Sequence, residues 1–246
     1  MPWRLLSFAR VGVKCGASNI NRKDLLILFA KSPHAGDVKT RLTPILSKKE
    51  RALLQEALIL DTLSLTASLS VTRALACTPN TEDQFFGKCA KEHAVLLVRQ
   101  DGDDLGERMK NGFYWAFSQG FQRVVIIGSD APTLPISFIK EAFNQIKTMP
   151  IVLGPAIDGG YYLIGTKWPL PDIFTHIRWG SNTVLSDTIA RLRRYHLLPF
   201  WYDIDYPKDM VFLMWHIALL AKQRGVIPVE TVSFLKGYSG SCYWSC

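Results

Sequence analysis

The sequence has few cysteines, no paired-cysteine motif and no long hydrophobic run. Only five of its 246 residues are Cys, and none of them forms a C-x-x-C motif. An odd number of cysteines argues against a disulfide framework, and Cys242 and Cys246 have no neighbouring histidine that would suggest a metal site. The most apolar segment, 210–221, is shorter than the ~18 residues of a membrane span and is interrupted by His216. The chain is therefore not expected to be a disulfide-stabilised or membrane-spanning protein, and a reducing, cytoplasmic environment is expected.

Acidic residues are missing from the first 23 positions. The net charge is +8, and five of the positive side chains, Arg4, Arg10, Lys14, Arg22 and Lys23, precede the first acid, Asp24. This uneven distribution weakens the argument for nucleic-acid binding. Residues 1–23 are interpreted as a basic leader or disordered tail. A transit-like segment, which would make the protein organellar, is an alternative, and so is a mis-assigned start.

The rest of the chain alternates between short apolar runs and longer helical patterns. Several of the runs lack polar alternation, as in strands that are buried on both faces of a parallel sheet. The expected strands are 25–30, 73–77, 94–98, 123–128, 151–153, 161–164 and 197–202, and the expected helices are 47–69, 105–119, 135–147, 181–194 and 207–223. Capping boxes are expected at Ser47 with Glu50 and at Asp104 with Glu107. This alternation predicts one α/β domain, residues 24–225, with a Rossmann-like, mostly parallel sheet flanked by helices and a C-terminal tail at 226–246.

A Walker A motif is also absent. The segment AKSPHAGDVKTRL, residues 30–42, contains Gly-x-x-Lys-Thr, but the required G-x-x-x-x-G-K-[ST] spacing is not met. A cationic turn after a buried strand remains, with Lys31, Lys39 and Arg41 around Gly36. Since ligands of open α/β sheets bind at the carboxyl ends of the strands, this turn is predicted to bind an anion.

Acidic residues follow several other predicted strands. Asp130, in IGSDAPTL, is either a ligand for Mg²⁺ or Mn²⁺ or part of a turn before the next helix. Asp158, in GPAIDGGYYLIG, either projects from a long shaped loop or belongs to an Asp-Gly hairpin turn. Asp205, in FWYDIDYPKDM, either faces the same way as Asp203 or caps the following helix. In QDGDDLGERM, Gln100 offers an amide suited to a nucleobase edge, and Gly106 permits close approach of the backbone.

These motifs, together with RWGSNTVLSDT, occur in an order that resembles a bacterial GT-A-type glycosyltransferase family once called a domain of unknown function. Some members of that family are associated with arsenosugar biosynthesis. It is similar at a distance to molybdenum-cofactor and phospholactate nucleotidyltransferases. The resemblance covers about residues 24–212 and departs from the family pattern at Tyr206 and Lys208.

The resemblance implies a nucleotide-diphospho-sugar transferase fold and a role for each matching residue. The implied diphosphate contacts are Lys31, Lys39 and Arg41 around Gly36, and the implied nucleobase contacts are Gln100, Leu105 and Gly106. Asp130 would hold Mg²⁺ or Mn²⁺ with Asp205 as a second ligand, and Asp158 would be the catalytic base facing the acceptor.

Three functions remain open from the sequence. The first is glycosyl transfer from a nucleoside diphosphate sugar to a small acceptor, with assistance from a divalent metal. The second is nucleotidyl transfer from a nucleoside triphosphate to a phosphorylated small molecule. Such nucleotidyltransferases usually open with a glycine-rich loop, whereas 30–37 contains only Gly36, which favours the first. The third is a non-enzymatic binding module, which the acidic loops disfavour.

Overall fold

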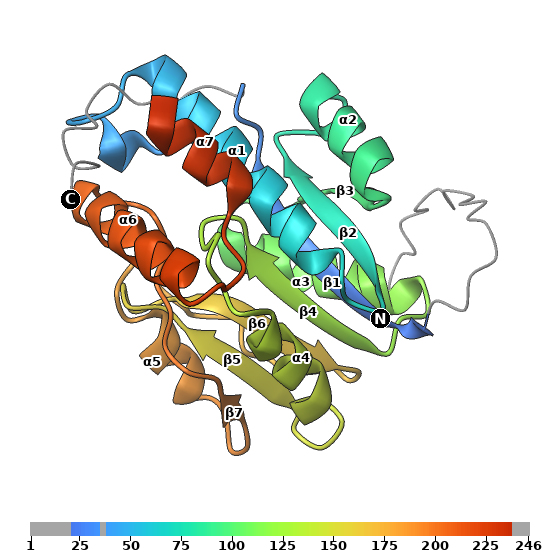
Figure 1. The fold of residues 1–246 in the computed structure, drawn as a ribbon. Coiled ribbons are helices and arrows are strands. Elements are labelled where there is room, and N and C mark those ends of the chain that lie inside the picture. Colours follow the sequence, from blue (N-terminus) through green and yellow to red (C-terminus); the bar gives the residue numbers. More distant parts are fainter. Residues whose placement is uncertain (1–20, 35–37, 238–246) are drawn as a thin grey trace.

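A computed structural model describes residues 21–34 and 38–237 and shows a seven-stranded sheet (Figure 1). The strands are β1 (Asn21–Lys31), β2 (Val71–Thr78), β3 (Leu96–Arg99), β4 (Arg123–Gly128), β5 (Ile151–Pro155), β6 (Tyr161–Lys167) and β7 (His196–Leu197). Their order across the sheet is β3-β2-β1-β4-β6-β5-β7. The prediction of a mostly parallel α/β sheet is confirmed. Only β6 runs antiparallel to its neighbours β4 and β5, because a short turn joins β5 to β6 and a parallel crossover needs a dozen or more residues.

Helices cover both faces of the sheet (Figure 1). They are α1 (Lys48–Thr66), α2 (Gln84–His93), α3 (Leu105–Ser118), α4 (Ile136–Gln145), α5 (Val184–Ile189), α6 (Pro207–Lys222) and α7 (Val229–Gly237), with a 3₁₀ turn at Thr40–Leu42. Alternate β1 residues enter different cores, because side chains of a strand point to opposite faces in turn. Leu26 and Leu28 pack in the core that contains residues of α1, α2 and α4, whereas Leu25 and Ile27 pack in the core that contains residues of α3. Among the described residues, no helix is both long and apolar enough to cross a membrane.

The expected N-terminal cap of α1 is confirmed, and that of α3 is confirmed only in part. Ser47 and Glu50 form the reciprocal capping box of α1. At α3, Asp104 accepts from the Glu107 N–H at 2.8 Å, but the Glu107 carboxylate accepts from the Asp103 N–H at 3.0 Å. The second half of the predicted box is therefore displaced by one residue.

Three of the predicted segments need correction, and one helix was not predicted. The expected strand 197–202 is reduced to β7 and one isolated bridge, Trp201 with Ala156. The expected helix 181–194 is reduced to α5, whose N-cap is Thr183. Helix α2 was not predicted from the sequence; its cap is Asp83, whose side chain accepts from the Phe85 N–H. Residues 21–23 of the expected leader belong to β1, while residues 1–20 lie outside the described part of the chain.

The expected C-terminal tail contains a helix that packs onto the domain. Helix α7 lies beside α1 (Figure 1). The buried Asp61 of α1 accepts hydrogen bonds from the backbone N–H groups of Glu230 at 3.0 Å and Thr231 at 2.7 Å. Leu235 of α7 shares a core with Leu54 and Leu58 of α1. The domain therefore extends at least to residue 237, and the remaining residues, 238–246, lie outside the described part.

Candidate active site

The strand order defines where a ligand would bind. From β1 the chain crosses through α1 to β2 on one side, whereas from β4 it crosses through α4 to β5 on the other side. Neighbouring strands β1 and β4 therefore form a topological switch point, and open α/β sheets bind ligands in the crevice at the carboxyl ends of such strands. Three predicted site residues lie there: Lys39 follows β1, Asp130 follows β4, and Asp205 precedes α6.

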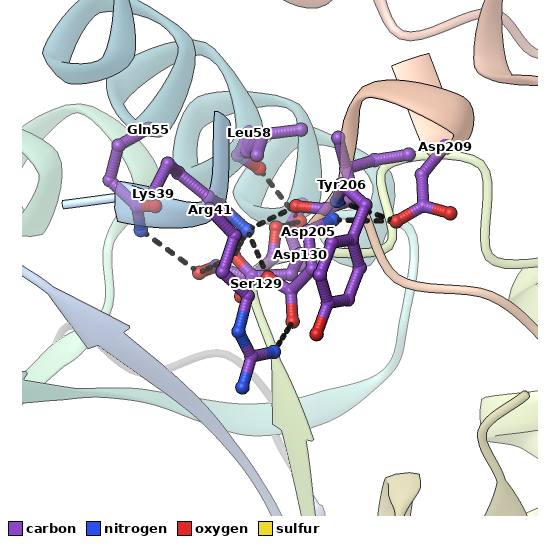
Figure 2. A network of polar contacts seen from close by, with 11 residues as sticks. Lys39, Arg41, Gln55, Leu58, Ser129, Asp130, Asp205, Tyr206 and Asp209 are labelled. Atoms are coloured by element: carbon purple, nitrogen blue, oxygen red, sulfur yellow. Dashed lines mark hydrogen bonds and ion pairs between the residues drawn. The ribbon is translucent and has the colours of Figure 1, made fainter. Parts of the chain in front are cut away.

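Lys39 lies at the centre of this group. Its ammonium group donates to the carbonyl oxygen of Ile204 at 2.6 Å and forms ion pairs with Asp130 at 2.9 Å and Asp205 at 3.4 Å (Figure 2). Only 4% of its side chain is exposed. Burial by itself would lower the pKa of Lys39, but the carboxylates of Asp130 and Asp205 more than offset it and raise the pKa above its ordinary value. The predicted diphosphate lysine is thus held between the two predicted metal ligands.

Arg41 lies at the exposed side of the cluster. Its guanidinium group donates to Asp205 at 2.9 Å and lies 5.2 Å from the ring centroid of Tyr206. Half of the Arg41 side chain is exposed. Arg41 can therefore reach a ligand outside the cluster without leaving Asp205, as a guanidinium group has five donors.

The loop that carries Asp205 is fixed from within its own sequence. The carboxylate of Asp209 accepts from the backbone N–H groups of Asp205 at 3.1 Å and Tyr206 at 2.7 Å (Figure 2). Pro207 begins α6 directly afterwards. Because these contacts use backbone N–H groups, they do not depend on the side chain of Tyr206, at which the sequence departs from the family pattern.

Asp130 is held by polar residues of α1 that the sequence analysis did not identify. Ser129 donates to the Asp130 carboxylate at 3.2 Å, and the buried amide of Gln55 donates to Ser129 at 3.3 Å (Figure 2). Thr62 donates to the carbonyl oxygen of Ser129 at 3.4 Å. The available signal was the position of the polar Gln55 and Thr62 beside the apolar residues Leu54, Leu58 and Leu63 of the predicted helix, because buried polar side chains need partners.

Asp203 is a further acid of the cluster that was noticed in the sequence but given no role. It is only partly exposed, and burial together with the nearby Asp130 raises its pKa to about 7, against the opposing effect of Lys39. Asp158 and Asp205 add smaller effects in the same direction. The Ile157 N–H donates to the Trp201 carbonyl oxygen at 3.0 Å, so that the turn between β5 and β6 lies beside the segment that carries Asp203.

Asp158 lies in a tight turn, so the expectation of a long shaped loop is wrong and the hairpin alternative is correct. Its carboxylate accepts from the Gly160 N–H at 2.9 Å, and the Ala156 N–H donates to the Gly160 carbonyl at 3.0 Å. Gly159 has φ +92°, and a Cβ there would lie 2.0 Å from the carbonyl oxygen of Asn182. Asp158 itself is exposed. The close approach of Asn182 thus requires glycine at position 159. The carboxylate of Asp158 remains accessible to an acceptor substrate.

The expected nucleobase residues lie at the other side of the switch point. The amide nitrogen of Gln100 donates to the carbonyl oxygens of Ala30 at 3.2 Å and Ala76 at 2.7 Å, so that it ties together the ends of β1 and β2. Gly106 is buried against Trp179, whose ring would lie 2.1 Å from an added Cβ. The amide donor of Gln100 and the open face of Gly106 are therefore already used within the protein. The half-exposed Leu105 and the exposed Lys31 remain accessible, and Gly36 lies outside the described residues.

The acids of the cluster offer oxygen donors for a metal ion but, among the described residues, no complete set of ligands. Within residues 21–34 and 38–237, no three His, Cys, Asp or Glu side chains are placed to hold a metal ion by themselves. Asp130 and Asp205 nevertheless offer carboxylate oxygens, the donors that Mg²⁺ and Mn²⁺ prefer. Mg²⁺ is commonly bound by one or two carboxylates plus substrate phosphates. The donor set fits that arrangement and does not form a closed protein cage.

Comparisons with known proteins agree with this geometry. A family model described as "Uncharacterized protein conserved in bacteria" (DUF2064) matches residues 61–181. The crystal structure of a "putative nucleotide-diphospho-sugar transferase" from Desulfovibrio desulfuricans is similar with 31% sequence identity and a TM-score of 0.76, over 88% of this chain and 98% of that one. A 2-phospho-L-lactate guanylyltransferase from Methanocorpusculum labreanum is 24% identical over 186 residues, which are 72% of this chain and 78% of the relative.

A more distant structure shares the fold alone. The 4-diphosphocytidyl-2C-methyl-D-erythritol synthase from Anaerococcus prevotii is 13% identical with a TM-score of 0.51, over 78% of this chain and 95% of that one. The expected resemblance to a bacterial transferase family, and distantly to nucleotidyltransferases, is therefore confirmed. The chain belongs to this bacterial family (DUF2064), a nucleotidyl- or glycosyltransferase-like enzyme family with the nucleotide-diphospho-sugar transferase fold.

Proposed function

We propose that the protein transfers a sugar from a nucleoside diphosphate sugar to a small acceptor molecule. The observation that carries this proposal is the position of Lys39, Arg41, Asp130 and Asp205 at the switch point between β1 and β4. The similarity to the Desulfovibrio protein, which covers nearly all of that chain, supports the choice of a nucleotide sugar as donor.

The charges of the cluster are arranged to accept a diphosphate. Lys39 compensates Asp130 and Asp205, so that these acids repel an incoming anion less than isolated carboxylates would. Arg41 and Lys31 are exposed at the same edge and are proposed to bind the diphosphate oxygens, because charge-assisted hydrogen bonds from Arg suit phosphate geometry. Together these cations stabilise the negative charge that develops on the departing diphosphate.

A divalent cation and a proton acceptor complete the proposed site. Asp130 and Asp205 would hold Mg²⁺ or Mn²⁺, which when bound supplies positive charge to the leaving diphosphate. Asp158 is proposed to take the proton of the acceptor hydroxyl, because its carboxylate is exposed in a turn close to the cluster. Lys31 and Leu105, the expected residues that remain accessible, are proposed to line the donor on the nucleotide side.

Nucleotidyl transfer is a second candidate function. The similarity to a guanylyltransferase favours it, and the same cations would stabilise the triphosphate of such a donor. The two reactions differ in their products: sugar transfer releases a nucleoside diphosphate, whereas nucleotidyl transfer releases pyrophosphate.

A binding screen followed by product analysis tests the proposal. Nucleotide sugars and nucleoside triphosphates are added with Mn²⁺, and thermal stabilisation is measured. A ligand at ~100 times its dissociation constant is expected to add about 2.7 kcal/mol to the free energy of unfolding. The best ligand is then incubated with small-molecule acceptors, and release of nucleoside diphosphate is expected. Release of pyrophosphate from a nucleoside triphosphate would instead show that the protein catalyses nucleotidyl transfer.

The Asp130→Asn variant tests the metal assignment. It is expected to remain folded and to lose Mn²⁺-dependent nucleotide binding, because an amide is a weaker ligand for a hard cation than a carboxylate. The control is Asp172→Asn, which makes the same change at an exposed position next to Ile173. Unchanged Mn²⁺-dependent binding in a folded Asp130→Asn protein would remove Asp130 from the metal site.

A further inference from the structure

The antiparallel direction of β6 brings positive side chains together at the amino-terminal ends of β1 and β4. The candidate active site lies at the other end of these strands. Asp24 of β1 is in register with Arg123 of β4, and Arg123 is in register with Lys167 of β6. Because β6 ends where β1 and β4 begin, Lys167 and Trp168 lie beside the first residues of these strands. Lys23, Arg123 and Lys167 therefore lie across three adjacent strands.

These residues line an open pocket of about 860 Å³. Its walls contain Lys23, Arg123, Lys147 and Lys167, and none of the described residues that line it is acidic. The pocket lies at the amino-terminal ends of β1 and β4, whereas Lys39 and Asp130 follow the carboxyl ends of the same strands. It is thus separate from the candidate active site.

Two of the pocket lysines retain uncompensated charge. Arg123 forms a bidentate ion pair with Asp24, in which the Nη2–Oδ2 distance is 2.9 Å. By contrast, Lys167 donates to the backbone carbonyl of Lys147 at 2.7 Å, and Lys147 donates to the side-chain oxygen of Asn144 at 2.8 Å. Both acceptors are neutral, and no carboxylate in the described part of the chain pairs with Lys147 or Lys167. The pocket therefore has a net positive wall that attracts an anion.

Much of the remaining pocket lining is aromatic. The Trp168 side chain is 61% exposed, with its ring centroid 5.7 Å from that of Phe117 and 6.5 Å from that of Tyr114 in edge-to-face arrangements. Phe117 and Tyr114 are three residues apart on α3, so that both face the pocket. An exposed indole supported at its edge provides a surface on which a planar ring can stack.

We propose that this pocket is a second ligand site that binds a small aromatic anion, such as a nucleoside monophosphate. The base would stack on Trp168, and the phosphate would bind Lys147 and Lys167. A stacking surface combined with cations is also how proteins bind the bases and phosphates of single-stranded nucleic acids without sequence preference. This inference does not depend on the proposed sugar transfer, because it uses none of the same residues.

The test is to measure GMP binding by isothermal titration calorimetry with the full-length protein. Trp168→Ala is expected to weaken binding at the pocket about 5-fold or more, because base stacking is lost. Lys147→Glu with Lys167→Glu is expected to weaken it about 10-fold or more, because two charge-assisted contacts become repulsive. Lys39→Ala, at the candidate active site, is expected to leave binding at the pocket unchanged, so that loss at one site is distinguished from loss at the other.

The matched control is Lys88→Glu with Lys91→Glu, the same change of charge on the exposed surface of α2. Wild-type GMP binding in this control, together with the losses above, supports the proposal. Wild-type GMP binding in both pocket variants overturns it. Inorganic phosphate and guanosine are titrated in parallel, and equal affinity for inorganic phosphate and GMP would overturn the aromatic part of the assignment.

Discussion

Asp158 is the residue at which a structural and a catalytic role are most directly separated. Its carboxylate accepts one backbone hydrogen bond, from Gly160 at 2.9 Å, and is otherwise exposed in the β5–β6 turn. An asparagine can accept the same hydrogen bond with its side-chain oxygen. The turn is thus expected to tolerate asparagine at position 158, but an asparagine cannot act as a general base.

We predict that Asp158→Asn keeps the fold and the affinity for donor but lowers turnover about 10²–10⁴-fold, the usual cost of losing a general base. The measurements are steady-state turnover and the dissociation constant of the donor. Asp172→Asn serves as the matched exposed control. Near-wild-type turnover of Asp158→Asn would leave Asp158 with a role in the turn alone.

Asp203 is expected to make stability depend on pH. Its pKa in the folded, ligand-free protein is raised to about 7, whereas an aspartate in an unfolded chain titrates near pH ~4. Between these values the folded state binds more protons than the unfolded state, so the free energy of unfolding should fall as pH rises from ~4 to ~7.

We predict that Asp203→Asn reduces this fall, because an amide does not titrate. Urea unfolding at pH 5 and pH 8, without divalent cations or nucleotide, measures the effect. The variant should gain stability relative to wild type at pH 8 and not at pH 5. The same pH dependence in both proteins would show that Asp203 titrates normally.

At the scale of the elements, Asp61 of α1 holds α7 against the domain by accepting hydrogen bonds from its first turn. The carboxylate of Asp61 accepts from two N–H groups in the first turn of α7, and Leu235 adds an apolar contact with the α1 core. The buried carboxylate has a pKa raised by desolvation, which its hydrogen bonds to Thr231 and Glu230 oppose. The first-turn N–H groups of a helix have no partners within the helix and therefore depend on such external acceptors.

We predict that Asp61→Ala lowers the free energy of unfolding by about 1–3 kcal/mol, since it leaves two backbone donors without their acceptor. The urea midpoint and hydrogen exchange in 229–237 measure the loss. Glu92→Ala, at an exposed position on α2, is the control. Unchanged exchange in α7 after Asp61→Ala would show that apolar packing alone holds this helix.

At the scale of the whole molecule, the excess of positive charge should strengthen the binding of phosphorylated ligands at low salt. The net charge is +8, and long-range attraction between exposed charges is screened over ~10 Å at 0.1 M salt. Arg41 is half exposed and lies at the rim of the candidate site. Its contribution to binding is therefore expected to be sensitive to salt.

We predict that donor affinity falls as salt rises from 50 to 500 mM, and that Arg41→Ala weakens binding by roughly 1.5–3 kcal/mol and reduces the salt dependence. The dissociation constants of a nucleotide sugar and of the corresponding nucleoside are compared in both proteins. If the nucleoside binds as tightly as the nucleotide sugar and loses as much affinity in Arg41→Ala, Arg41 does not bind the phosphates.

The sequence by itself determined the class of fold and the main elements. Continuous apolar runs such as 123–128 identify strands buried on both faces, and Ser47 with Glu50 marks the start of α1, because both signals depend on residues close together in the chain. The ordered motifs were sufficient to identify the family. They also selected Asp130, Lys39 and Asp205 before their proximity was known.

Only the tertiary structure decided how these residues are paired. Lys39 is separated from Asp205 by more than 160 positions, and no local pattern indicates that its ammonium group lies between Asp130 and Asp205. The same holds for Gln55 behind Ser129, for Asp61 beneath α7 and for Lys167 beside Arg123. Each of these contacts depends on strand order and helix placement, which arise from burial across the whole domain. That is the physical reason why the sequence could identify the reactive side chains but not which of them neutralise, cap or orient one another.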